Sequence, residues 1–238
     1  MKTRVLILIN HISYGGAARA ATLWAGMLAD ANYDVTVLTH YPCQDEYELN
    51  PRIKRICLVP NYQTYTKFRY KKNALKMLLE QYLAKHPQDI LIPFLTNSNL
   101  VAAFCEQKQL KVVTQTIRNS PWDKEYGFKL ILRNLAIQRQ GSVILQNNEQ
   151  TKYFNLPEYK HVKKYIVHNP LNPEILKIKK ESYQTIKKIV AVGRLSKQKN
   201  YTLMIEAMRI LRDEYHENYL LDIYGDGELK DELQSQIN

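Results

Sequence analysis

Positively charged side chains and glycines alternate with short apolar runs between residues 188 and 227. Residues 188–200 read KIVAVGRLSKQKN, and residues 221–227 read LDIYGDG. The pattern predicts a strand, a basic loop, a helix, a second strand and a glycine turn. In the basic loop, Gly193 lets a ligand approach the backbone, Arg194 offers a planar fork that suits a phosphate, and Lys199 adds a cation. Asn200 is a good N-cap for the helix, so these cations and the helix N-terminus are predicted to meet one pyrophosphate. The alternative is a solvated basic loop.

A second glycine loop lies near the N-terminus, in residues 10–19 (NHISYGGAAR). Gly15 and Gly16 precede an expected helix, where backbone amides can approach a phosphate or a sugar. The same pair also suits a plain strand-to-helix turn. The loop lacks the G-x-G-x-x-G fingerprint, and the next strand ends in Thr39-His40 instead of an acid that binds a ribose. No G-x-x-x-x-G-K-[ST] phosphate loop occurs either. NAD and ATP are therefore disfavoured as ligands.

The net charge of +11 comes mainly from two basic stretches. Residues 61–86 hold six Lys or Arg against one Glu, and residues 159–200 hold eleven against two acids, whereas residues 201–238 are acidic. Such patches suit phosphate-bearing ligands or an anionic membrane, and they are equally compatible with solvated faces. We expect no nucleic-acid partner. The three cysteines, Cys43, Cys57 and Cys105, have neither metal nor redox spacing, and no apolar run reaches 18 residues. These features predict a cytoplasmic protein.

Short apolar strands alternate with helical segments along most of the chain. The strands are expected at 4–10, 35–39, 55–59, 90–94, 111–116, 142–146 and 164–168, and the helices between them include 17–31, 67–85, 97–107 and 148–154. This alternation predicts an α/β fold with a doubly wound, Rossmann-like domain over residues 1–170. Two prolines in 169–173 interrupt it. Strands at 188–192 and 219–224, with a helix at 201–215, then predict the incomplete start of a second Rossmann-like domain over 171–238.

These motifs together resemble glycosyltransferase family 4, which has the GT-B fold. The residues that carry the resemblance are Ala191-Val-Gly193-Arg194-Leu-Ser-x-Gln-Lys199-Asn200, Ile223-Tyr-Gly225-Asp-Gly227, Gly15-Gly16-Ala-x-Arg19, His168-Asn-Pro170 and Gln115-Thr-Ile-Arg-Asn-Ser-Pro121. The last of these is similar to a loop of the family members that build polysaccharides. The resemblance covers the whole chain, and its 191–227 motif is specific.

The resemblance implies sugar transfer from a nucleotide-sugar donor to a glycan or lipid-linked acceptor, with retention of anomeric configuration and without a metal or other cofactor. Arg194 and Lys199 would bind the donor diphosphate and stabilise the departing nucleotide. Gly15 and Gly16 would lie near the same phosphates, while Gly193, Gly225 and Gly227 would shape the crevice. The first domain would meet the acceptor and the second the donor.

Two departures from the family pattern affect these expectations. Arg118 stands where many relatives have an active-site His, so it is the tentative polar group there. The family's E-x7-E donor element has no counterpart after Gly227. The acids Asp123 and Glu125 are expected to complement a helix dipole and not to bind metal.

The expected helix at 67–85 combines basic residues with leucines on one face. Lys67, Arg69, Lys71, Lys72 and Lys76 accompany Leu75, Leu78, Leu79 and Leu83. Such a helix could lie on an anionic membrane, which would make the protein peripheral to the inner face of the cell membrane.

The sequence leaves a second function open, that of a non-catalytic sugar- or phosphate-binding protein. An oxidoreductase is disfavoured because the fingerprint acid is missing. The two strands expected after residue 171 make only a marginal sheet by themselves. We therefore expect a truncated chain whose last third is unstable and which does not turn over a donor.

Overall fold

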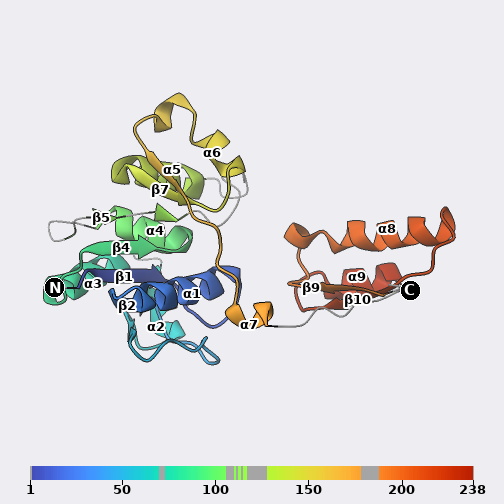
Figure 1. Cartoon of the computed structure of the whole chain (residues 1–238), viewed down its shortest axis with the longest axis horizontal. Coiled ribbons are helices and arrows are strands. Elements are labelled where there is room, and N and C mark those ends of the chain that lie inside the picture. Colours follow the sequence, from blue (N-terminus) through green and yellow to red (C-terminus); the bar gives the residue numbers. More distant parts are fainter. Residues whose placement is uncertain are drawn as a thin grey trace. The chain divides into compact units, whose positions relative to one another are not determined.

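The computed structural model describes residues 2–69, 73–105, 110, 112–113, 115–116, 128–177 and 188–237. The chain folds into two compact units, Met1–Ile175 and Leu176–Asn238, drawn in Figure 1. Along the sequence, the boundary between them falls within α7 (Pro173–Leu176), shortly after the prolines that interrupt the sequence pattern. Among the described helices, none has both the length and the apolar character needed to cross a bilayer.

A five-stranded parallel sheet forms the centre of the first unit. Its order is β3-β2-β1-β4-β5, with the strands β1 (Arg4–Ile9), β2 (Asp34–Thr39), β3 (Lys54–Cys57), β4 (Ile90–Pro93) and β5 (Val112–Val113). The central β1 pairs with β2 in the register Arg4↔Asp34 to Ile9↔Thr39. All carboxyl ends therefore point to one edge of the sheet.

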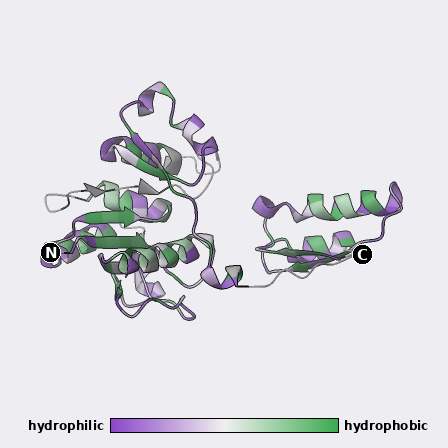
Figure 2. Cartoon of the chain, in the orientation of Figure 1, coloured by the Kyte–Doolittle hydropathy of each residue, from purple (hydrophilic) through white to green (hydrophobic). Residues whose placement is uncertain are grey.

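Helices cover both faces of this sheet, as the continuous apolar strands predict. On one face, Val5, Ile7 and Ile9 pack against the alanines of α1 (Gly16–Asp30). On the other face, Leu6 and Leu8 pack against α3 (Ala74–Lys85) and α4 (Leu95–Ala103). Figure 2 shows the hydrophobic colour concentrated in these strands. The predicted doubly wound α/β architecture is thus confirmed.

A second, three-stranded parallel sheet completes the first unit, in the order β6-β7-β8. Its strands are β6 (Gln115–Thr116), β7 (Ser142–Leu145) and β8 (Lys163–Ile166), and they are accompanied by α5 (Phe128–Gln140), α6 (Glu149–Tyr153) and a 3-10 turn at Pro157–Tyr159. The single strand predicted at 111–116 is wrong. The chain changes partner there, because β5 pairs with β4 and β6 pairs with β7.

The single helix predicted at 67–85 is also wrong, because two helices occupy the region. They are α2 (Tyr62–Arg69) and α3, and Asn73 before α3 has a non-helical backbone. Leu75, Leu79 and Leu83 are buried in the first unit. The apolar face predicted from the leucines therefore exists, but it packs against the sheet and not against a membrane.

The second unit contains two parallel strands, β9 (Lys188–Val192) and β10 (Leu220–Tyr224). A 3-10 turn at Lys197–Lys199 leads into α8 (Tyr201–Asp213), and α9 (Lys230–Ile237) follows β10. Residues from both helices and both strands form its core, namely Ala191, Leu195, Tyr201 and Leu233, with Met204, Ile205, Leu221, Ile223 and Leu229 around them.

The opposite face of this small sheet is open within the described part of the chain. Val190 and Val192 are 55% and 78% exposed, and Leu220 and Tyr224 are 68% and 57% exposed. An ion pair between Lys188 and Asp222 joins the strands beside them. The unit thus covers one sheet face and exposes apolar side chains on the other.

Candidate functional site

Backbone hydrogen bonds join the loops that follow β9 and β10. The Gly193 amide donates to the Tyr224 carbonyl at 3.0 Å, and the Leu195 amide donates to the Asp226 carbonyl at 2.9 Å. The Leu195 carbonyl in turn accepts from the Leu229 amide at 3.1 Å. The side chain of Leu195 is buried in the unit's core. These bonds extend the strand pairing past the strand ends and fix the backbone of the basic loop.

Two glycines, Gly225 and Gly227, allow this close pairing of the loops. A Cβ at Gly225 would lie 1.9 Å from the Gly193 carbonyl oxygen, and a Cβ at Gly227 would lie 2.4 Å from the Leu195 carbonyl oxygen. A Cβ at Gly193 would lie 2.8 Å from the Tyr201 hydroxyl. Gly225 and Gly227 therefore have a steric reason to be glycine, because one backbone crosses directly against the other, whereas a Cβ at Gly193 would meet side-chain atoms.

Replacing Gly225 with alanine should separate the two loops. The added methyl group cannot coexist with the Gly193 carbonyl, so the Leu195 amide should lose its bond to Asp226. We expect hydrogen exchange at the Leu195 amide to accelerate by at least about tenfold, as local opening becomes easier. Gly16→Ala is the control, since nothing lies within 4 Å of a Cβ there. Unchanged exchange in Gly225→Ala would show that this crossing does not hold the loops together.

The predicted cations lie on this fixed loop with their side chains in solvent. Arg194 and Lys199 are both exposed, and among the described residues neither forms an ion pair or a side-chain hydrogen bond. In contrast, Lys188 pairs with Asp222, and Arg209 pairs with Glu206. Carbons of the Lys199 side chain lie 3.7 and 3.9 Å from the place of a Gly193 Cβ, so this lysine extends over the glycine. The loop is therefore able to offer two cations to an anionic ligand.

Asn200 precedes α8 as predicted, but it does not cap the helix with its side chain. Its backbone is left-handed, with φ 51° and ψ 46°, and no side-chain capping hydrogen bond forms. The preceding 3-10 turn ends at the same residue, and Asn tolerates this conformation better than most residues. The predicted cap chemistry is thus wrong. The amides at the start of α8 gain no bond from this side chain.

In the first unit, the loop after β1 contains the other predicted glycines. Gly15 precedes α1 with a left-handed φ of 91°, and its carbonyl accepts from the Arg19 amide at 3.0 Å. A Cβ at Gly15 or at Gly16 would meet open space. Gly15 is therefore required by its backbone conformation, and the space beside both residues could admit a ligand. Arg118 lies outside the described residues, as do Asp123 and Glu125.

Aromatic side chains that were not predicted as site residues form an aromatic belt at the carboxyl edge of the five-stranded sheet. The belt consists of Tyr14 and His11 after β1, Tyr41 after β2, and Tyr62 and Tyr65 on α2. Neighbouring ring centroids lie 4.9 Å apart for His11 and Tyr14, 5.6 Å for His11 and Tyr41, and 5.0 Å for Tyr41 and Tyr62. Tyr65 lies 4.6 Å from Tyr41. The available signal was the run of aromatic residues just after predicted strands, in a chain with 17 tyrosines.

His40 lies under the belt and is fully buried. Its Nε2 is 3.3 Å from the Ser98 hydroxyl, which also lies 3.4 Å from Asn10 Oδ1. If Nε2 donates to Ser98 and Ser98 donates to Asn10, both contacts are satisfied. The remaining Nδ1 has no hydrogen-bond partner in the described structure. Burial lowers the pKa of His40 to about 3, so the ring is neutral near pH 7.

This histidine should make the fold sensitive to acid. Its pKa in the folded state is below the unfolded value of about 6.5, so the unfolded chain takes up the proton first. The stability it contributes is complete above pH 6.5 and is lost as the pH falls toward 3. We expect the unfolding free energy, measured with urea, to drop by up to about 1.4 kcal/mol per pH unit between pH 6 and 5.

His40→Gln should remove most of that slope, whereas His86→Gln should keep it. His86 caps the end of α3 beside the Tyr82 ring and serves as the matched control. An equal pH slope in the wild type and in His40→Gln would contradict the assignment.

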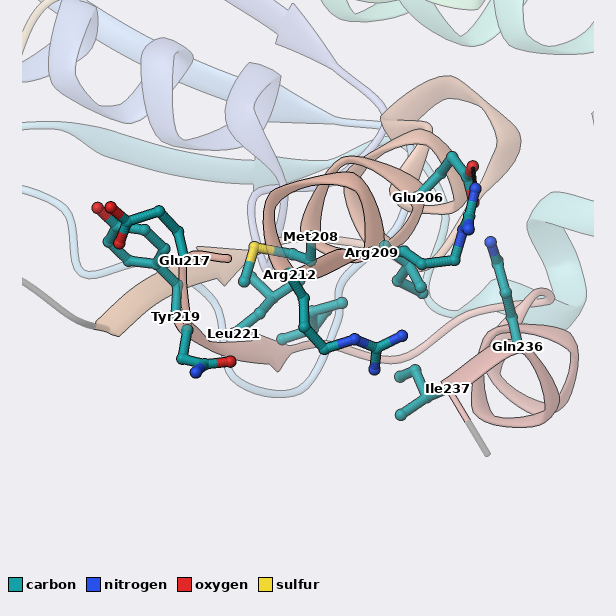
Figure 3. A pocket seen from close by; sticks show the side chains of 12 residues that line it. Glu206, Met208, Arg209, Arg212, Glu217, Tyr219, Leu221, Gln236 and Ile237 are labelled. Atoms are coloured by element: carbon teal, nitrogen blue, oxygen red, sulfur yellow. Dashed lines mark hydrogen bonds and ion pairs between the residues drawn. The ribbon is translucent and has the colours of Figure 1, made fainter. Parts of the chain in front are cut away.

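A groove of about 490 Å³ lies in the second unit (Figure 3). It is bounded by α8, the residues before and within β10, and α9, and none of the predicted site glycines or cations lines it. Glu206 and Arg209 at its rim pair with each other. We therefore regard it as a gap between packed elements, and we assign the candidate site to the loops.

The described residues include no group of three or more His, Cys, Asp or Glu side chains able to hold a metal ion. The basic loop carries three exposed cations, Arg194, Lys197 and Lys199. Such a loop suits an anionic ligand directly.

Comparison with known proteins finds similarity to glycosyltransferases. Residues 173–238 match the family model described as Glycosyl transferases group 1. The chain is 22% identical over 238 residues to the GalNAc-alpha-(1->4)-GalNAc-alpha-(1->3)-diNAcBac-PP-undecaprenol alpha-1,4-N-acetyl-D-galactosaminyltransferase of Campylobacter jejuni, covering 98% of this chain. It is 24% identical over 249 residues to the amylovoran biosynthesis glycosyltransferase AmsD of Erwinia amylovora, again covering 98% of this chain. The chain spans 64% and 65% of the lengths of these two relatives.

Solved structures share the fold. A mutant of TarM from S. aureus, in complex with Fondaparinux, alpha-GlcNAc-glycerol and UDP, matches with a TM-score of 0.74 and 10% identity, covering 99% of this chain and 74% of TarM. HepE from Anabaena, in complex with UDP, matches with a TM-score of 0.66 and 14% identity, covering 100% of this chain and 65% of HepE. The chain therefore has the α/β fold of GT-B glycosyltransferases and has homologues in bacterial polysaccharide biosynthesis.

Proposed function

We propose that this chain is the acceptor-side domain and part of the donor-side domain of a retaining family 4 glycosyltransferase of the hexosyltransferase type. The whole enzyme would transfer a sugar from a nucleotide-sugar donor to a glycan or lipid-linked acceptor during assembly of a bacterial surface polysaccharide. The similarity to the Campylobacter and Erwinia enzymes supports the substrate class. Retention would be tested by the anomeric configuration of the product, determined by NMR.

The observation that carries the proposal is the fixed loop with Arg194 and Lys199, two exposed cations that form no ion pair with any residue that the structure describes. When the bond between the anomeric carbon and the donor diphosphate breaks, negative charge accumulates on the departing diphosphate. Arg194 and Lys199 would stabilise that charge without a metal. Because Leu195 fixes the loop through its amide and its carbonyl, little reorganisation would be needed when the ligand binds.

Removing either cation should weaken binding of a nucleoside diphosphate. We expect Arg194→Ala and Lys199→Ala each to raise the Kd for UDP, measured by isothermal titration calorimetry, by about tenfold or more, as for a lost charge-assisted hydrogen bond. Lys197→Ala removes the same charge from the same exposed loop and should change the Kd by less than about threefold. Equal losses in all three variants would indicate unspecific attraction, and unchanged affinity in the first two would remove these residues from the donor site.

The open face of the β9–β10 sheet supports a narrower proposal about turnover. Val190 and Val192 are strongly exposed there, and so is Leu220 at the start of β10. A doubly wound sheet normally has helices on both faces. We propose that donor turnover requires further protein on this face, such as the remaining third of the relatives' length, and that binding without turnover is the property of these 238 residues. This keeps a non-catalytic, binding role as the alternative.

Membrane association is proposed in a purely electrostatic form, with the protein in the cytoplasm. Because the leucines of α3 are buried, exposed lysines such as Lys67 and Lys85 are what the 67–85 region can offer to a bilayer. The double variant Lys67→Glu, Lys85→Glu should co-sediment less with phosphatidylglycerol vesicles at low salt than the wild type does. Lys160→Glu, Lys163→Glu is the control with the same charge change. Sedimentation of the wild type that ignores lipid charge and salt would contradict the proposal.

A further inference from the structure

We propose that the aromatic belt of the first unit (His11, Tyr14, Tyr41, Tyr62 and Tyr65) is a binding surface for the sugar rings of a neutral glycan. The inference rests on the proposed function, since it takes the acceptor to be a glycan, and it names the surface that would bind it.

The position of the belt favours a ligand surface. His11 and Tyr14 follow β1, and Tyr41 follows β2, so these residues lie at the carboxyl edge of the parallel sheet. In open α/β sheets, ligands bind outside this edge. Gly15, whose surroundings are open, lies directly beside Tyr14 in the same loop.

The belt has an anchored middle and exposed ends. Tyr41 and Tyr65 are 8% and 4% exposed and belong to a core cluster with Val59 and Leu75. Tyr14 and Tyr62 are 65% and 51% exposed. If the rings served only to pack the core, Tyr14 and Tyr62 would also be buried. Instead, the core holds the inner rings, and their contacts with Tyr62 and, through His11, with Tyr14 present ring surface to solvent.

The chemistry of the belt suits a sugar better than a phosphate. A pyranose ring has apolar C–H faces and a hydroxyl rim, and tyrosines can bury the former while their hydroxyls bond the latter at a small entropic cost. Burial lowers the pKa of His11, although the nearby Glu46 opposes this, so the His11 ring is neutral at pH 7. Asn97 donates to the Tyr65 hydroxyl at 3.4 Å and adds an exposed amide beside it. The belt thus offers aromatic faces and neutral polar groups.

The loops after β1 and β2, which hold His11, Tyr14 and Tyr41, are also held in place. The Tyr47 amide donates to the Ile12 carbonyl at 2.8 Å, which ties the loop after β2 to the loop after β1. Glu46 accepts from Arg55 in an ion pair, and its carboxylate also accepts from the Cys43 amide at 3.1 Å. These contacts fix the segment that begins at Tyr41. A surface formed in advance loses less entropy when a ligand binds.

The test measures glycan binding to the full chain without any donor. Saturation-transfer NMR with chitobiose, lactose and maltose as probes should show transfer from the protein to sugar ring protons for at least one of them. We expect Tyr62→Ala and Tyr14→Ala each to raise the Kd for that sugar about threefold to tenfold, since each loses one stacked ring. Tyr165→Ala on β8 is the matched control, because Tyr165 is 49% exposed and lies outside the belt. Its Kd should equal that of the wild type.

Three outcomes would overturn the inference. They are no saturation transfer from any of the sugars, equal Kd values in Tyr62→Ala, Tyr14→Ala and Tyr165→Ala, and binding of undecaprenyl phosphate but not of sugars. Thermal melting shows whether each variant is folded, and both belt substitutions are at exposed positions. UDP binding to the same samples separates this test from the proposed function. Sugar binding without UDP binding would contradict the donor site alone, and the reverse would contradict the belt alone.

Discussion

Parallel strand pairing is the constraint on which the arrangement of both units depends. Within each sheet it brings the carboxyl ends of all strands to one edge. The loops that leave that edge are neighbours for this reason alone. In the first unit this places the residues after β1 beside those after β2. In the second it places Gly193 against Gly225. Candidate functional residues that are distant in the sequence thus meet as a consequence of topology.

The side chains that strand pairing brings together differ in chemistry between the two units. The second unit presents cations on a backbone that is hydrogen-bonded on both sides of Leu195. The first presents neutral rings, with His40 buried and uncharged beneath them. A glycosyl transfer needs both kinds of surface, one for a charged leaving group and one for an uncharged sugar hydroxyl and its ring. In the proposed reaction, the basic loop would meet the charged leaving group and the aromatic belt would meet the neutral sugar.

The hydrophobic periodicity and the positions of glycine and proline predicted the fold class well. They did not predict features that depend on contacts between distant segments. Val5–Ile9 could be identified as a buried strand because a short strand covered by helices on both faces is apolar at every position. The leucines of α3 were recognised as one apolar face, but a periodic pattern does not say whether that face meets a membrane or a sheet. The strand at 111–116 was divided because its pairing partner changes, which no local pattern encodes. The aromatic belt was missed for the same reason, since its rings come from three separate segments.

In the second unit the predicted glycines have a clear steric role, whereas the predicted side-chain cap at Asn200 does not form. Gly225 and Gly227 are fixed by atoms of another segment, the Gly193 and Leu195 carbonyls, and a side chain at either place would collide with backbone. Only glycine avoids this collision, so the requirement is visible in the sequence. Asn200, in contrast, satisfies the turn by adopting a left-handed backbone, which leaves its side chain free of the capping role that its type suggests. Steric exclusion therefore leaves a clearer mark in this sequence than a favourable hydrogen bond does. The same loop leaves Arg194 exposed beside the buried Leu195, and carbons of the Lys199 side chain lie 3.7 and 3.9 Å from the place of a Gly193 Cβ.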